Sequence, residues 1–254
     1  MFVTVTIITS VTYRNWKYEQ EIAGLLWKIN LNDLQFYSGS LPMSSSKMSL
    51  ASQASEMQIQ IFTKTATYKG TIVAVKQMRY NKRMIDISRN TKKEMKLMKE
   101  IHHDNINPFI GAYIEPSCIY IVTEYCAKGS LLDILENDDL KLDHMFISSL
   151  VFDLISAMIF LHESDMKFHG NLKSPNCVVT SRWVLKVTDF GIHHLRANCE
   201  PDISNSGDNY YRNLLWKAPE LLRNHSAYGT QKGDVYSFAI ILHEIIVRQG
   251  PFAI

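Results

Sequence analysis

The first part of the chain alternates between apolar and polar stretches of different character. Residues 1–12 (MFVTVTIITSVT) are apolar or β-branched, and the basic residues Arg14 and Lys17 follow directly. Twelve residues are too few for a bilayer core, which needs about 20. Apolar residues followed by basic ones are nevertheless typical of the cytosolic end of a membrane span, and a signal peptide would carry its charge first. A buried strand or a frayed terminus remains the alternative.

Residues 13–55 read as a helix followed by a linker. Ile22, Leu25, Leu26 and Ile29 recur at helical spacing, so we expect a juxtamembrane helix over residues 13–29. Residues 38–55 are mostly serine with glycine and proline, which is a linker composition. Their hydroxyl groups are candidate phosphate acceptors, although an unmodified tether is equally open. The candidate phosphorylation sites are Ser44, Ser45, Ser46, Ser49 and Ser52.

From residue 56 onward, short β-branched segments come first and helical patterns come later. Strands are predicted over residues 58–62, 65–68, 71–78 and 119–124, with a hairpin over 178–180 and 184–187. Helices are predicted over residues 91–101, 131–135, 146–162 and 234–247, the last being apolar on nearly every face. This order predicts an α+β fold with a strand-rich part over residues 56–126 and a helical part over residues 127–254.

Composition adds little to this picture. Of 254 residues, 46% are hydrophobic and 20% are charged, which is ordinary for a folded protein. The net charge of +2 comes without a basic stripe, so nothing indicates a nucleic-acid partner. The four cysteines lack CxxC spacing, and we interpret them as reduced thiols.

Several motifs resemble those of protein kinases and occur in the kinase order. Residues 73–76 (VAVK) resemble the third kinase strand, whose lysine contacts ATP phosphates, and Glu94 on the next helix is placed to pair with Lys76. Residues 123–126 resemble the hinge that takes the adenine edge, and residues 189–191 (DFG) and 218–220 (APE) frame a segment of normal length. The resemblance assigns ATP binding to Lys76, Glu94, Thr123, Glu124, Cys126, Asn176 and Asp189, and magnesium binding to Asn176 and Asp189.

What this resemblance implies is a bilobal protein-kinase-like fold with a small β-rich N-lobe and a helical C-lobe. Asp234 resembles the aspartate that opens the central buried helix of the C-lobe. An alternative for Lys76 and Glu94 is an ion pair that stiffens the small lobe without ATP.

The catalytic loop departs from the kinase pattern. His169-Gly170-Asn171 stands where kinases have His-Arg-Asp. Asn171 cannot accept the proton of a substrate hydroxyl, and a positioned general base is typically worth about 10²–10⁴ in rate. Gly170 removes the arginine that grips a phosphorylated activation loop, whereas Lys173 still matches the Ser/Thr-kinase pattern. We therefore assign no confident catalytic residue to this degenerate loop.

The phosphate-covering loop departs as well. Kinases use G-x-G-x-x-G because backbone amides must approach the phosphates closely. Residues 61–70 contain no glycine before Gly70. Because phosphoryl transfer depends mostly on positioning and charge stabilisation, losing this loop together with the base argues against efficient transfer.

Longer stretches resemble the kinase homology domain of receptor guanylyl cyclases of the natriuretic-peptide-receptor type. These stretches are residues 13–16, 26–29, 61–70, 123–131, 169–179, 215–222 and 233–238. The resemblance implies a single-pass membrane receptor that is a homodimer, in which this cytosolic segment binds ATP and restrains a cyclase domain that makes cyclic GMP. No cyclase domain lies in these residues. An active Ser/Thr-type kinase and a scaffold that binds no nucleotide are the alternatives.

The sequence stops a few residues past the helix predicted over 234–247, whereas a kinase large lobe has several more helices. We therefore expect an incomplete C-lobe and a piece of a longer chain, with Ile254 as a natural end being the alternative. We expect the missing helices to leave several of the following residues exposed: Phe238, Ile241, Leu242, Ile245 and Ile246.

Overall fold

The computed structural model describes residues 2–23, 26–36, 64–79, 87–116, 118–197, 211–224 and 228–253. The strand predicted over residues 58–62, the serine-rich linker with its five candidate phosphorylation sites, and residues 61–63 of the phosphate-covering loop lie outside these ranges.

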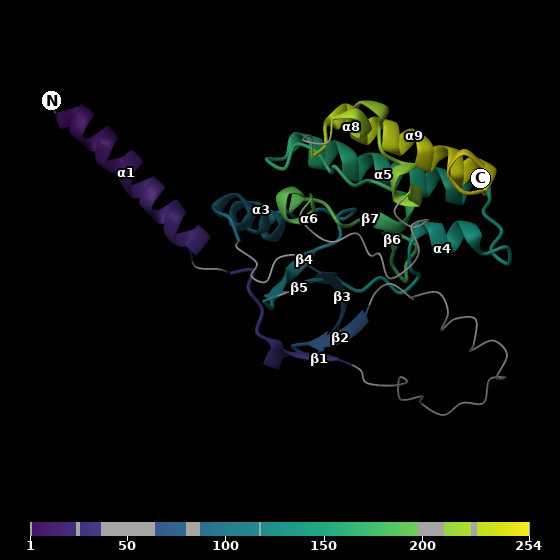
Figure 1. The fold of residues 1–254 in the computed structure, drawn as a ribbon, viewed down its shortest axis with the longest axis horizontal. Coiled ribbons are helices and arrows are strands. Elements are labelled where there is room, and N and C mark those ends of the chain that lie inside the picture. Colours follow the sequence, from purple (N-terminus) through teal and green to yellow (C-terminus); the bar gives the residue numbers. More distant parts are fainter. Residues whose placement is uncertain are drawn as a thin grey trace.

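In the described residues, the N-lobe consists of a five-stranded sheet and helix α3 (Figure 1). The strand order is β1-β2-β3-β5-β4, and each neighbouring pair is antiparallel. The elements are β1 (Leu34–Phe36), β2 (Lys64–Tyr68), β3 (Thr71–Arg79), α3 (Arg89–Glu100), β4 (Phe109–Ile114) and β5 (Cys118–Glu124). The strands predicted over residues 65–68, 71–78 and 119–124 and the helix over 91–101 are confirmed, whereas β1 and β4 were not predicted.

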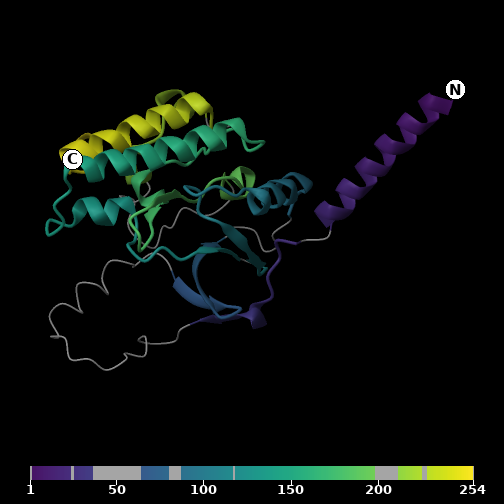
Figure 2. The ribbon, with the colours of Figure 1, turned by 180° about the vertical axis from the view of Figure 1, so that it is seen from behind.

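The C-lobe is built on helices, with one small hairpin facing the N-lobe (Figure 1). Its elements are α4 (Leu131–Glu136), α5 (His144–Glu163), β6 (Cys177–Val179), β7 (Leu185–Val187), α6 (His193–Ala197), α8 (Pro219–Arg223) and α9 (Gln231–Val247). Seen from the opposite side, α9 lies along α5 (Figure 2). The α+β, bilobal kinase-like fold is confirmed.

Side chains at the N-terminal ends of four helices explain where these helices begin. Ser88, Ser130, Asp143 and Thr230 each accept a hydrogen bond from a backbone amide in the first turn of α3, α4, α5 and α9. Such caps satisfy amides that have no partner within the helix and contribute about 1 kcal/mol each. At the start of α4 the side chain of Asp133 completes a capping box with Ser130.

Helix α5 is the described helix that is long and apolar enough to cross a membrane. One of its faces is buried in the main hydrophobic cluster through Leu150, Leu154, Ala157, Met158 and Leu161. We therefore interpret α5 as the core helix of the C-lobe, for which a largely apolar sequence is expected.

The segment before the kinase-like lobes differs from its prediction. Helix α1 runs over Phe2–Ala23, so it begins well before residue 13 and its described part ends before residue 29. Residues 2–12 are therefore helical, and the alternative of a buried strand there is wrong. The side chains of Val5, Ile7, Ile8 and Val11 are exposed, and α1 projects away from the N-lobe (Figure 2). The ion pair of Glu19 with Arg89 connects α1 to α3.

Residues 26–36 then follow the N-lobe sheet, and we call them the strap. Trp27 lies in a turn and Ile29 follows the bridge residue Lys28; both side chains are buried, although the pattern placed Ile29 in a helix. The amide of Ile29 donates to the Ala112 carbonyl at 2.9 Å, and the amide of Ala112 donates to the Trp27 carbonyl at 2.8 Å. After this parallel bridge to β4, the chain pairs with β2 as strand β1. The strap thus contacts the sheet at the β4 edge and forms the opposite edge as β1.

The expected exposed face of α9 is partly wrong. Ile241 and Ile245 are buried, because they face α5 and the main core. Ile246 is 67% exposed, as expected. The described exposed apolar side chains of the two helices instead include Val235, Val247, Met145, Phe152, Ile155 and Ile159.

The close fit between the strap and β4 yields a testable prediction. A Cβ on Gly111 would collide with the Trp27 carbonyl and would lie 2.8 Å from Cγ1 of Ile29. Gly111→Ala should therefore displace the strap, at a cost of about 1–3 kcal/mol for overpacking. Hydrogen exchange should accelerate about tenfold or more at the amides of Ile29 and Ala112. The Val187 amide, which donates to the Asn105 carbonyl in the interlobe region, is the internal reference. The same change in exchange rate at all three amides, relative to wild type, would contradict the prediction.

Candidate nucleotide-binding site

The lysine and the aspartate expected to hold ATP and magnesium contact each other. On β3, Val73 and Val75 are buried on one face of the sheet, and Lys76 lies on the opposite face. Its ammonium forms an ion pair with the carboxylate of Asp189, and Arg196 donates to the Asp189 carbonyl at 2.7 Å. Burial raises the pKa of Asp189, but the charges of Lys76 and Arg196 outweigh it and hold the pKa well below its usual range.

Glu94 has a different partner from the predicted one. Its carboxylate accepts a hydrogen bond from the backbone amide of His193 at 3.1 Å. Lys76 is paired with Asp189 instead, so the expected Lys76–Glu94 ion pair is wrong in this conformation, and so is the alternative in which that pair stiffens the lobe. The physical reason is that residues after the DFG motif fold into α6, which packs against α3 and presents its first amide to Glu94.

The start of the activation segment also fills the space between the lobes. Phe190 and Ile192 are 2% and 1% exposed, respectively. The cavity that remains has a volume of only about 10 Å³, far below the roughly 300–1,000 Å³ of typical ligand sites. Two of the predicted ATP-binding residues, Thr123 and Asp189, line it. The other lining residues are Met98, Asn107, Phe109, Ile121, Thr188, Phe190, Ile192 and Arg196.

The hinge is held by contacts to both lobes. The carboxylate of Glu124 forms an ion pair with Lys186 of β7 at 2.8 Å, and its carbonyl accepts a hydrogen bond from the side-chain amide of Asn107 at 3.2 Å. Burial raises the pKa of the Cys126 thiol to about 11, so this thiol stays protonated at neutral pH. Sequence reasoning missed Asn107, because the strand β4 that follows it was not predicted either.

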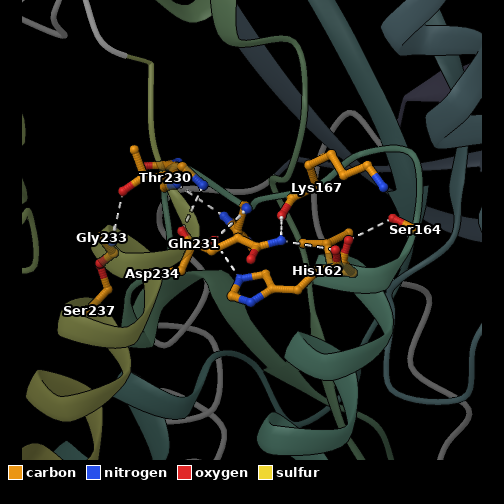
Figure 3. A network of polar contacts seen from close by, with 12 residues as sticks. His162, Ser164, Lys167, Thr230, Gln231, Gly233, Asp234 and Ser237 are labelled. Carbon is orange, nitrogen blue, oxygen red and sulfur yellow. Dashed lines mark hydrogen bonds and ion pairs between the residues drawn. The ribbon is translucent and has the colours of Figure 1, made fainter.

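A buried carboxylate at the start of α9 organises the catalytic loop. Asp234 accepts hydrogen bonds from the backbone amides of His169 at 2.7 Å and Gly170 at 2.9 Å. It also contacts Nε2 of His162 at 2.9 Å, as Figure 3 shows. The ring of His169 contacts the Thr188 carbonyl at 2.9 Å. Burial lowers the pKa of His169 to about 4, although the nearby charge of Asp234 opposes this shift, so the ring is neutral at pH 7.

Neighbouring contacts hold the loop end of α9 in the same region. Gln231 donates to the carbonyls of His162 at 3.0 Å and Lys167 at 2.8 Å (Figure 3). Ser237 donates to the carbonyl of Trp216, which belongs to the activation segment. Helix α9 therefore contacts both the loop and the segment that follows the DFG motif.

The space beside Gly170 is occupied, so the missing arginine has no vacant position. Gly170 adopts a φ of +73°, and a Cβ there would lie 2.8 Å from the Tyr228 carbonyl and 3.0 Å from the His193 ring. The His193 ring stacks on Phe168 with ring centroids 4.6 Å apart. An arginine at this position would require His193, and with it α6, to move.

The remaining loop residues hydrogen-bond to other groups of the protein. Asn176 donates through its side chain to the carbonyl of Asn171 at 2.7 Å, and the Asn171 amide donates to the His169 ring at 3.1 Å. Lys173 donates to the side chain of Asn213 at 2.7 Å. Burial, helped by the charge of Lys76, lowers the pKa of Lys173 to about 8. No group of three or more metal-ligating side chains is preassembled within the described ranges.

The comparisons with known proteins agree with this geometry. The family of protein tyrosine and serine/threonine kinases matches residues 54–252. This chain belongs to that family. The specific resemblance to the kinase homology domain of receptor guanylyl cyclases is confirmed as well.

Three relatives illustrate this kinase homology domain. A receptor-type guanylate cyclase of Drosophila melanogaster is 54% identical over 97% of the chain, which covers 16% of that protein. Atrial natriuretic peptide receptor 2 of Anguilla japonica is 45% identical over 97% of the chain and 24% of the relative. The resact receptor of Arbacia punctulata is 45% identical over 94% and 25%. The chain thus spans between a sixth and a quarter of these relatives.

A second buried carboxylate in this domain gives a pH prediction. Glu244 of α9 accepts hydrogen bonds from Ser174 at 2.8 Å and from the Trp216 indole at 2.7 Å. Burial raises its pKa from 4.5 to about 7, although both hydrogen bonds oppose the shift. The folded state then binds a proton that the unfolded state releases, so this group makes the free energy of unfolding fall as pH rises from about 4.5 to 7.

Glu244→Gln should remove this dependence, because the amide mimics the protonated acid. Urea unfolding at pH 5 to 8 should show wild type losing about 2.5 kcal/mol relative to the variant, because the pKa of Glu244 rises from 4.5 to about 7 on folding. The titration of His169 is common to both proteins and cancels in the difference. Parallel stability curves would contradict a raised pKa at Glu244.

Proposed function

We propose that the chain is the ATP-binding regulatory pseudokinase domain of a membrane receptor guanylate cyclase. The observation that carries this proposal is that the phosphate-binding lysine and the metal-binding aspartate are kept and paired, while the base is replaced by Asn171. The position of the missing arginine is filled by His193. These are features of a site that binds nucleotide but lacks the groups for efficient transfer.

Nucleotide binding in such a site is coupled to a conformational change. Lys76 would bind the phosphates of ATP, and Asp189 and Asn176 would bind magnesium. Both ligands would therefore compete with the Lys76–Asp189 ion pair. The cavity of about 10 Å³ must also widen to admit a nucleotide. A ligand that binds only the open arrangement shifts the population toward it, which would release α6 from Glu94.

The proposed setting follows from the relatives, whose names describe receptors and guanylate cyclases. In this setting the parent protein makes cyclic GMP, the cyclase domain lies in cis outside this chain, and the receptor is a homodimer. Residues 1–12 would be the cytosolic end of a single span, with the rest of the segment in the cytosol. Phosphorylation within residues 38–55 would add charge near the N-lobe.

A second candidate function is a working Ser/Thr-type kinase that uses a substitute base. The observation that favours it is the pKa of Lys173, lowered to about 8 by burial, because a partly neutral amine accepts a proton. Its contact with Asn213 and the ion pair between Lys76 and Asp189 count against this role in the observed conformation.

ATP with magnesium should stabilise the domain. At 100 times its dissociation constant, ATP contributes about 2.7 kcal/mol, or roughly 5–10 °C in Tm for a chain of this size. Lys76→Ala should abolish this shift, whereas Lys141→Ala should preserve it, because Lys141 is exposed in the loop before α5. Thermal unfolding with and without nucleotide measures both. The absence of a shift in wild type, or its survival in Lys76→Ala, would refute ATP binding at this site.

Phosphotransfer should stay at background in wild type and in Asn171→Asp. Restoring the carboxylate leaves the Lys76–Asp189 ion pair and the occupied space beside Gly170 unchanged, and these concern positioning. Transfer of radiolabel from ATP to the domain and to a generic protein substrate is the measurement. Robust transfer by wild type that Asp189→Ala abolishes would establish the active kinase instead.

A further inference from the structure

Asn107 is a buried polar side chain in the wall of the pocket, between α3 and β4. It is 2% exposed and lines the pocket together with Thr123 and Thr188. Its backbone amide donates to the Val187 carbonyl at 2.9 Å, which fixes the position of the residue between the lobes. Its side chain is therefore held at the junction of the hinge, the interlobe hairpin and the residue before the DFG motif.

The orientation of the Asn107 amide follows from its partners. The Glu124 carbonyl can only accept a hydrogen bond, so the NH₂ group of Asn107 faces it, at 3.2 Å. The thiol of Cys126 lies 3.9 Å from the amide oxygen on the other side. The second hydrogen of the NH₂ group has the Thr188 hydroxyl as its partner at a long 3.4 Å, beyond the usual range for a good hydrogen bond.

This arrangement changes what the hinge offers to a purine base. A bare hinge carbonyl is an acceptor and selects a base that carries an amino group in front of it. A base with an oxo group there would bring two acceptors together, which is unfavourable when both are buried. Asn107 places a donor beside the Glu124 carbonyl, and this donor has a second hydrogen that is only weakly used.

We propose that Asn107 is a base-selecting residue that admits nucleotides with a 6-oxo purine, such as inosine or guanosine triphosphate, alongside ATP. One hydrogen of its NH₂ group stays on the Glu124 carbonyl, and the other moves from the Thr188 hydroxyl to the oxo group of the base. For adenine, the 6-amino group uses a carbonyl acceptor, either Glu124 or the oxygen of a rotated Asn107 amide. This inference rests on the proposed nucleotide site and adds its base selectivity.

Binding of the magnesium complexes of ATP and inosine triphosphate to the full chain tests this role, because the two bases differ only in the hydrogen-bonding groups of one edge. Titration calorimetry should give dissociation constants within about tenfold of each other for wild type. Asn107→Val removes the donor and should raise the ratio of inosine to adenosine constants about tenfold or more. Asn107→Thr, whose single hydroxyl hydrogen caps Glu124, should raise it similarly and serves if the valine variant fails to fold.

Asn105 provides a matched control on the same loop. It is also a buried asparagine, and its side chain donates to the Leu185 carbonyl at 3.1 Å, but it does not line the pocket. Asn105→Val should destabilise the chain without changing the ratio of the two constants. If ATP binds wild type and the ratio is the same in the Asn107 variants, the base-selecting role is overturned and the proposed ATP site stands. If neither nucleotide binds wild type, both proposals are overturned.

Discussion

The geometry of the site depends on the hydrogen bonds that the buried carboxylate of Asp234 accepts from the catalytic loop. This carboxylate is 2% exposed, and it faces two backbone amides of the catalytic loop and the ring of His162. A buried carboxylate is tolerated only when hydrogen bonds replace its lost hydration, and removing its partners typically costs about 3–5 kcal/mol. Because the loop amides are those partners, the geometry of residues 169 and 170 is set by α9 and survives the loss of the catalytic aspartate and arginine.

The closed pocket follows from this rigid loop and from one competition between charges. His169 contacts the carbonyl of Thr188, which places the DFG aspartate next in the chain. Asp189 then has two cations within reach: Lys76 pairs with its carboxylate, and Arg196 donates to its backbone carbonyl. With Lys76 engaged, Glu94 accepts the first amide of α6. The charged groups that we propose for nucleotide binding thus contact other groups of the chain in this structure.

The N-lobe is connected to the preceding helix by backbone contacts as well as by side chains. The strap bonds to Ala112 of β4, and Phe109 of the same strand lines the pocket. On the other side, α1 and α3 share the Glu19–Arg89 ion pair, and α3 carries Glu94. An exposed ion pair of this kind contributes little to stability, so the strap is the firmer connection. The segment before the lobes therefore contacts two elements of the pocket wall: the strap contacts β4, and α1 contacts α3.

The sequence by itself determined the parts of this protein that depend on local pattern. The β-branched segment over residues 71–78 and the helical apolar pattern over residues 146–162 predicted β3 and α5 correctly, since these signals act over a few residues. The kinase motifs identified the charged residues of the site, Lys76, Glu94 and Asp189. Only the tertiary structure decided which charges pair, because Lys76 and Asp189 lie 113 residues apart and Glu94 competes for the same cation. The contacts of Ile29 and Asn107 could likewise not be predicted from the sequence. Ile29 bonds to β4 and Asn107 bonds to the hinge, and only the folded chain brings these segments together.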